Sequence, residues 1–216
     1  MNSTTKKILL GIEFLLLFFC VPLLIYFDDK LVHPSAILLP IVLLLGIYLW
    51  RNPEFAFRDL VRIKLTRSDI IRSIVVFVIT GIVLSLSVYV FDRENLFNLF
   101  RSNILIWILL CIFYPVFSAY MQEIIFRTFL FLRYKALFQS RRTMILASGI
   151  AFSFVHIVYY SALSMIITFF GGIFLAYVYD KTRSVLFTAI LHGIFGDLIF
   201  TVGLGHYFWL DIDKFL

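Results

Sequence analysis

Residues 70–91 read IIRSIVVFVITGIVLSLSVYVF, and the fold class follows from their composition. Arg72 is its single charged side chain, and its apolar residues are continuous rather than alternating. A helix crosses a bilayer core with about 20 apolar residues, whereas the strands of a membrane barrel alternate apolar and polar side chains. The stretch therefore predicts a transmembrane helix.

The composition of the whole chain agrees with a membrane protein. Of its 216 residues, 62% are hydrophobic and 15% are charged. An ordinary soluble domain has about 45–50% apolar and about 25% charged residues. A soluble chain of this length cannot bury so much apolar surface, so we expect the lipid bilayer to be its solvent. The net charge of +6 lies in short loops between apolar runs, which indicates topology and not nucleic-acid binding.

Seven apolar runs are long enough to cross a membrane, so we expect an all-α, polytopic transmembrane bundle of about seven spans. An eighth span or a re-entrant segment is the alternative. The first run follows Lys6 and Lys7 and is too long for a signal-peptide core, so it is interpreted as an uncleaved span. The predicted spans are residues 8–27, 34–50, 70–91, 104–132, 143–160, 162–179 and 184–204.

The basic residues predict how the spans are oriented. With the N-terminus in the cytoplasm, most of the 19 Lys and Arg residues fall in cytoplasmic segments. The exceptions are Lys30, Arg93, Arg101 and Lys214. Cytoplasmic loops carry the excess of Lys and Arg in membrane proteins. We therefore expect a multi-pass protein with a cytoplasmic N-terminus, in the inner membrane of a bacterium.

Residues 1–103 are predicted to form N-terminal transmembrane helices, with a cytoplasmic amphipathic connection at 51–69. This connection carries apolar side chains among basic ones. It is either a helix lying on the inner leaflet or a solvated linker, and both interpretations stay open. Residues 205–216 form a short C-terminal tail.

Few ionisable residues lie inside the predicted spans, where they are costly and often functional. Glu123 and Arg127 are four residues apart and therefore share one helix face. An Arg in that position keeps a Glu ionised and orients it. The alternative is a buried ion pair that only joins helices.

Two histidines lie on other spans. Phe152 and His156 share a face, and His192 is followed by Gly193 and Gly196, which we expect to let a neighbouring helix approach closely. Asp197 lies about 140° round the helix from His192 and faces the same point only if the helix is distorted.

One Glu and two His on three spans form a plausible chemical set. Glu123, His156 and His192 could activate a water and stabilise an oxyanion. The same three side chains could instead hold a divalent metal such as zinc, with water as a further ligand. Both possibilities stay open.

The Glu-x-x-x-Arg segment with Thr128, the Phe-x-x-x-His segment and the later His resemble the three motifs of the CAAX protease and bacteriocin-processing family (CPBP, or Abi). The resemblance covers residues 104–204 and implies a catalytic core there, with its site in a cavity. It implies an intramembrane endopeptidase that hydrolyses a peptide bond in a peptide or membrane-protein substrate.

The resemblance also implies roles for these residues. Glu123 would be the base and Arg127 would orient it. His156 would activate water or bind metal, and His192 would stabilise the oxyanion or bind metal. The supporting residues would be Gln122, Phe152 and Asp197.

Two positions depart from the family motifs. Gln122 replaces a Glu that commonly activates water in the family, and Gly196 replaces the expected oxyanion partner. Because Gln takes up no proton at neutral pH, either Glu123 acts instead, or the branch is inactive, or the Gln is an inactivating change. An inactive membrane scaffold or bacteriocin-immunity-type protein is therefore the alternative to the protease. A proton-coupled transporter is a third hypothesis, against which the absence of a sequence repeat argues.

Overall fold

Helices account for nearly all the secondary structure of residues 2–27 and 34–208, which the computed structural model describes, and no strand occurs in these ranges. Six helical segments there are long and apolar enough to cross a membrane. A shorter apolar segment, Pro40–Arg51, belongs to the helix that follows the first of them. Together they match the predicted spans in order, which confirms the all-α membrane fold.

Several spans are built from more than one helical type. The first joins α1 (Ser3–Leu15), a π-helical turn at Leu16–Cys20 and α2 (Val21–Phe27). The second and third are α3 (Pro34–Arg51) and α5 (Arg67–Phe91). The short helix α6 (Asn98–Ser102) leads into the fourth span.

The fourth span consists of five segments in one continuous run: α7 (Ile104–Phe113), a π-helical stretch at Tyr114–Ala119, α8 (Tyr120–Glu123), a second π-helical stretch at Ile124–Phe129, and α9 (Leu130–Arg133). The last three spans are α10 (Arg141–Val155) with a 3₁₀ turn at His156–Tyr159, α11 (Ala162–Thr182) and α12 (Val185–Val202).

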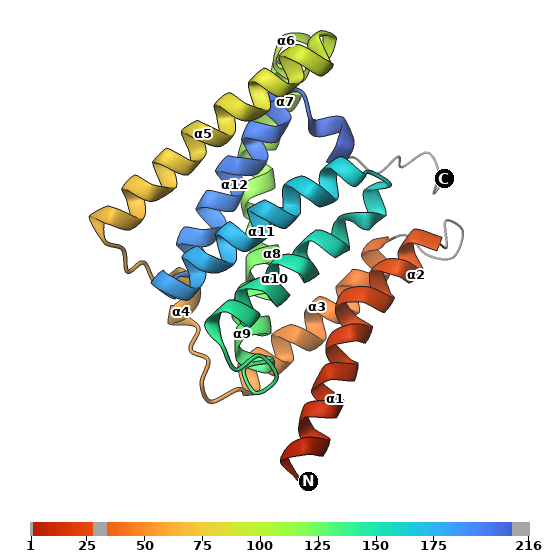
Figure 1. The fold of residues 1–216 in the computed structure, drawn as a ribbon, viewed down its shortest axis with the longest axis vertical. Helices are drawn as coiled ribbons and strands as arrows, with labels where there is room; N and C mark the ends of the chain where they lie inside the picture. The colour runs from red at the N-terminus through yellow and green to blue at the C-terminus, as the bar shows by residue number, and fades with distance from the viewer. Residues whose placement is uncertain (1, 28–33, 209–216) are drawn as a thin grey trace.

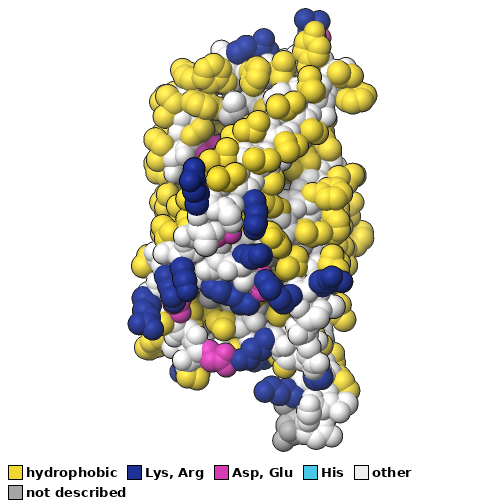
Figure 2. All heavy atoms as spheres, turned by 60° about the vertical axis from the view of Figure 1, so that its left-hand side comes forward, with side chains coloured by type: hydrophobic (Ala, Val, Ile, Leu, Met, Phe, Trp, Pro, Cys, Tyr) yellow, Lys and Arg dark blue, Asp and Glu magenta, His cyan; other side chains and the backbone are white. Residues whose placement is uncertain are grey.

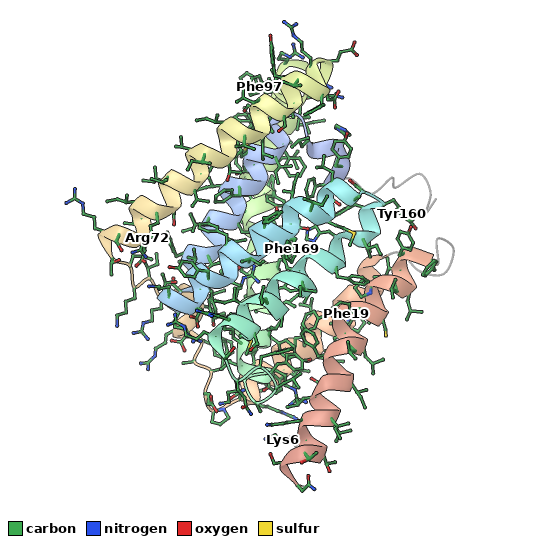
Figure 3. All side chains as sticks on the ribbon, in the orientation of Figure 1. Lys6, Phe19, Arg72, Phe97, Tyr160 and Phe169 are labelled. Atoms are coloured by element: carbon green, nitrogen blue, oxygen red, sulfur yellow. The ribbon has the colours of Figure 1, made fainter. Side chains whose placement is uncertain are left out.

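Successive spans run in alternating directions between two ends of the bundle (Figure 1). Lys6 and Arg72 lie towards the lower and left side of Figure 3, whereas Phe97 and Tyr160 lie towards the opposite end. In Figure 2, Lys and Arg side chains gather over the lower half of the visible face, with a smaller group at the top. This distribution agrees with the predicted alternation. The predicted outer residues Lys30 and Lys214 lie outside the described residues.

The outward face of α5 is apolar along its length. Ile79, Leu86 and Val90 are each more than half exposed. A contiguous apolar surface of this kind is unusual on a soluble monomer but is the expected contact surface with lipid tails. Figure 2 shows hydrophobic side chains over most of the upper half of this side of the molecule.

Helices α10 and α11 form a closely packed antiparallel pair that fixes the position of the α10 C-terminus. A Cβ added at Gly172 would lie 3.2 Å from the backbone oxygen of Gly149, and one added at Gly149 would lie 2.6 Å from Ile173 Cγ1. Small residues allow membrane helices to approach closely. Close packing matters in lipid because there is little hydrophobic driving force for helices to associate. The pair holds the 3₁₀ turn that carries His156.

The predicted connection at 51–69 is shorter in the structure, because α3 ends at Arg51 and α5 begins at Arg67; residues 52–66 contain one short helix, α4 (Arg58–Val61), and no continuous interfacial helix. It is tied across the end of the bundle. The Tyr120 hydroxyl donates to the backbone oxygen of Leu60 at 3.1 Å, and the Ser184 hydroxyl donates to that of Arg62 at 2.6 Å. In the predicted tail, residues 205–208 form a 3₁₀ turn, and residues 209–216 lie outside the described part of the chain.

Candidate active site

The fourth span changes helical type on both sides of α8. Pro115 lies at the start of the first π-helical stretch, where its missing N–H removes one α-helical hydrogen bond. π-Helical turns are rare and are often found at functional sites. Gln122 and Glu123 lie on α8 between the two π-helical stretches and bind different neighbours, Ser118 and His192.

Glu123 is the centre of a buried polar cluster. Its Oε2 lies 2.8 Å from Arg127 Nε, and its Oε1 accepts a hydrogen bond from His192 Nδ1 at 2.9 Å. The side chains of Glu123 and Arg127 are both 0% exposed. The four-residue spacing thus brings the pair together as expected, and the carboxylate also links α8 to α12.

Arg127 has further partners that fix the fourth span against α10. Its Nη1 donates to the Ser148 hydroxyl, which in turn donates to the backbone oxygen of Phe126 at 2.9 Å. The Phe152 ring centroid lies 5.3 Å from the guanidinium carbon. A fully buried cation is tolerated when it is paired and hydrogen-bonded; Glu123 supplies the ion pair and Ser148 the hydrogen bond, while Nε is satisfied by the ion-pair contact alone.

His156 has a defined proton position. Its Nδ1 lies 2.6 Å from the backbone oxygen of Phe152. A carbonyl oxygen only accepts, so Nδ1 carries the hydrogen and, in the neutral ring, Nε2 has the free lone pair. The ring of Phe152 contacts both histidines, with centroid distances of 4.8 Å to His156 and 5.3 Å to His192. The predicted supporting residue therefore lies between the two.

The proton of His192 is also placed by its partners. Because Glu123 is an acceptor, His192 Nδ1 donates to it, and in the neutral ring Nε2 accepts from the Tyr114 hydroxyl at 3.1 Å. Sequence reasoning missed Tyr114, which is one of many aromatic residues in an apolar run. Its one distinguishing signal is the adjoining Pro115, which marks an irregular helix.

A cavity of about 490 Å³ lies in front of the two histidines, between α5, α10, α11, α12 and the fourth span. Ile79 on α5 and Ile166 and Phe170 on α11 line it and are each more than half exposed, so it opens between these helices on the lipid-facing surface. Its polar lining consists of Thr80, Tyr114, Ser118, Gln122, His156, Tyr159, Thr168 and His192.

A second cavity, of about 310 Å³, lies on the side of α2 and α3. It shares Ser118, Gln122, His156 and Tyr159 with the first. The Gln122 side chain donates to the Ser118 hydroxyl at 2.8 Å in this shared wall. Glu123 lines neither cavity.

The structure does not bring Asp197 to the first cavity. Helix α12 is continuous from Val185 to Val202, so no distortion turns Asp197 towards the face of His192. Gly193 has the packing role expected of it, since a Cβ there would lie 2.6 Å from Pro115 Cβ.

The arrangement of the carboxylates and histidines bears on the predicted metal site. Within the described residues, no three His, Cys, Asp or Glu side chains come together in a group that could hold a metal ion. Both oxygens of Glu123 face Arg127 or His192, and His156 Nδ1 faces a carbonyl. Glu123, His156 and His192 as arranged therefore do not fit the predicted metal site, and metal dependence stays a prediction.

Comparison with known families supports the resemblance. A family model described as "Type II CAAX prenyl endopeptidase Rce1-like" matches residues 100–196. These residues belong to the CAAX protease family. The CAAX protease region is a little under half of the chain and runs from α6 to Gly196 in α12, so it contains the whole Glu123–Arg127–His156–His192 cluster. Neither the curated proteins nor the solved structures gave a significant match.

Proposed function

We propose that the protein is an intramembrane endopeptidase that hydrolyses a peptide bond in an apolar peptide or membrane-protein substrate. One observation carries the proposal: His156 and His192 line one cavity, and His192 Nδ1 binds the carboxylate of a fully buried Glu123–Arg127 pair that lies outside the cavity lining. The cavity opens between α5 and α11, which gives a membrane-bound substrate a path from the lipid.

His156 is the proposed general base. Its Nε2 has a free lone pair and takes a proton from a water as the water oxygen attacks the peptide carbonyl carbon. The carbonyl oxygen becomes negatively charged on the side of the cavity where His192 Nε2 holds the Tyr114 hydroxyl. When the C–N bond breaks, His156 returns the proton to the leaving nitrogen, so the base is regenerated.

Glu123 and Arg127 act through His192 in this proposal. The sequence predicts Glu123 as the base, but its carboxylate is 0% exposed and lines neither cavity. A carboxylate that accepts from one ring nitrogen fixes the tautomer and the orientation of a histidine. Arg127 orients the Glu123 carboxylate, which is the role that the four-residue spacing predicts for it. Glu123 is thus a positioning residue.

Gln122 is the proposed water-positioning group. Its amide lies in the wall shared by the two cavities, together with His156. An amide both donates and accepts hydrogen bonds but does not exchange a proton at neutral pH, so it can hold a water for His156 without acting as a base.

The test is cleavage by the purified protein in liposomes. The probes are a farnesylated fluorogenic peptide with a Cys-aliphatic-aliphatic-X end and a library of unmodified apolar decapeptides, with products identified by mass spectrometry. We expect cleavage by the wild type and a loss of at least about 100-fold in His156→Ala and in His192→Ala. Equal product formation by the wild type and both variants contradicts the proposal.

A second candidate function is binding of the same class of substrate without hydrolysis. The observation that favours it is that the described lining of both cavities contains the Gln122 amide but no carboxylate. Wild-type protein that retains a farnesylated peptide in liposomes without cleaving it, and gains cleavage on Gln122→Glu, supports this candidate.

We also propose that the N-terminus and the segment 51–66 face the cytoplasm of a bacterium. Lys6 and Arg72 lie towards the same side of the bundle in Figure 3, which agrees with the excess of basic residues in cytoplasmic loops. A Cys introduced at Ser3 in a Cys20→Ser/Cys111→Ser background should resist a membrane-impermeant thiol reagent added to intact cells. Labelling from outside contradicts this orientation.

A further inference from the structure

Gly196 and Tyr114 occupy one place in the bundle. A Cβ added at Gly196 would lie 2.1 Å from Cε1 of the Tyr114 ring and 2.6 Å from its hydroxyl oxygen. Real Cβ atoms do not approach other atoms this closely, so the glycine is what allows the phenol to lie against α12. The neighbouring Gly193 admits Pro115 in the same way, and the two contacts together seat the start of the π-helical stretch on α12.

This contact presents the Tyr114 hydroxyl to the catalytic cavity. Tyr114, His192 and Gly196 all line it. The ring packs edge-on against Phe200, with centroids 5.5 Å apart, which restricts its motion. Its hydroxyl donates to His192 Nε2 at 3.1 Å. A phenol held this firmly beside a histidine is a preorganised hydrogen-bond donor.

We propose that Tyr114 is a catalytic residue whose O–H donates to the carbonyl oxygen of the scissile bond. The inference rests on the proposed peptidase function. In the resting site the hydroxyl hydrogen points to His192 Nε2, and a hydroxyl rotates freely about its C–O bond. When the substrate oxygen enters beside it and gains negative charge, the hydrogen turns to that oxygen. The proton stays on Tyr114 throughout, so this step forms and breaks no covalent bond.

The first part of the test is kinetic and uses Tyr114→Phe, which removes one oxygen and keeps the ring packing. Removal of one oxyanion donor lowers kcat by about 10²–10³-fold in other hydrolases, and we expect a loss in that range with KM changed by less than about threefold. Tyr120→Phe is the matched control, because its hydroxyl binds Leu60 O and lines neither cavity. It should cleave like the wild type.

The second part measures binding and does not require turnover. The probes are N-acetyl-S-farnesylcysteine aldehyde, which presents a carbonyl oxygen, and the corresponding alcohol, which does not. We expect the wild type to bind the aldehyde about tenfold more tightly than the alcohol, and Tyr114→Phe to lose that difference. Gly196→Ala should lose this preference too, because the added Cβ displaces the phenol. Adding Gly196→Ala to Tyr114→Phe should not change the aldehyde-to-alcohol ratio further.

The combined outcomes separate the two proposals. Cleavage by the wild type with an unchanged kcat in Tyr114→Phe overturns the Tyr114 assignment and leaves the peptidase in place. A Tyr114-dependent preference for the aldehyde in a protein that cleaves nothing supports the assignment of the donor and overturns the peptidase. Equal binding of aldehyde and alcohol by the wild type overturns the Tyr114 assignment whether or not the protein cleaves.

Discussion

Two Glu–Arg pairs in this bundle have the same chemistry and different surroundings. Glu13 on α1 pairs with Arg133 at the end of α9, where their side chains are 32% and 33% exposed. Glu123 pairs with Arg127, and both side chains are 0% exposed. The third partner also differs, since Tyr134 donates to Glu13 Oε1 at 3.1 Å, whereas His192 donates to Glu123 Oε1 at 2.9 Å.

The difference separates a pair that joins helices from a pair that orients a reactive group. Around Glu13, Phe14 packs against Tyr134 and Phe138, with centroids 5.1 Å away in each case, so the pair ties the first span to the end of the fourth. Burying charges costs more than an isolated pair returns, so complete burial of Glu123 and Arg127 needs the extra contacts to Ser148 and His192. A pair maintained at that cost is a better candidate for function than one at the bundle end.

Of the substitutions that compare the two Glu–Arg pairs, Glu123→Gln should lower stability and cleavage the most. It leaves Arg127 as an unpaired buried cation, which costs about 3–5 kcal/mol of unfolding free energy in other proteins, and it removes the anion that orients His192. We expect cleavage to fall by more than about 100-fold, measured on protein that remains folded by circular dichroism. Arg127→Met in the same chain should restore much of the stability but not the cleavage.

Ser148→Ala should have an intermediate effect. It removes the hydroxyl that receives Arg127 Nη1 and leaves that donor without its side-chain partner. An unsatisfied buried donor costs about 1–3 kcal/mol, which a thermal unfolding scan detects as a lower Tm. We expect a smaller loss of cleavage than in Glu123→Gln, since the contact from Glu123 to His192 remains. Ser153→Ala is the matched control on the same helix, because Ser153 donates to Met165 O.

Glu13→Gln should have the smallest effect. Partly exposed ion pairs contribute about 0.2–1 kcal/mol, and Gln still accepts a hydrogen bond from Tyr134. We expect a small fall in Tm and cleavage within about twofold of the wild type. A loss of cleavage equal to that of Glu123→Gln would remove the distinction between the pairs.

Metal analysis checks the remaining sequence prediction. The proposed mechanism assigns its steps to His156, His192 and their partners without a metal. Near-stoichiometric zinc in protein purified without chelators, lost in His156→Ala/His192→Ala, would establish a histidine-ligated metal and replace this division of roles. Zinc content that is low and equal in both proteins is the expected result.

The sequence predicts the spans and part of the site because those features depend on short-range patterns. The apolar runs define the helices, and the four-residue spacing brings Glu123 to Arg127. The position of Tyr114 depends on a π-helical stretch and on Gly193 and Gly196, which follow it by 79 and 82 residues in the chain, and no local pattern specifies such a contact. The sequence also could not decide whether Glu123 is the base. Its burial and its hydrogen bond to His192 depend on how three spans pack together.

His156 and His192 are proposed to hydrolyse a peptide bond in the cavity between α5 and α11. The most direct measurement is time-resolved mass spectrometry of a farnesylated fluorogenic peptide incubated with the protein in liposomes, beside His156→Ala and His192→Ala at equal folded concentration. We expect two complementary fragments from the wild type and at least about 100-fold slower release from each variant. An intact peptide with the wild type, or fragments formed at the same rate by all three proteins, would contradict the proposed hydrolysis.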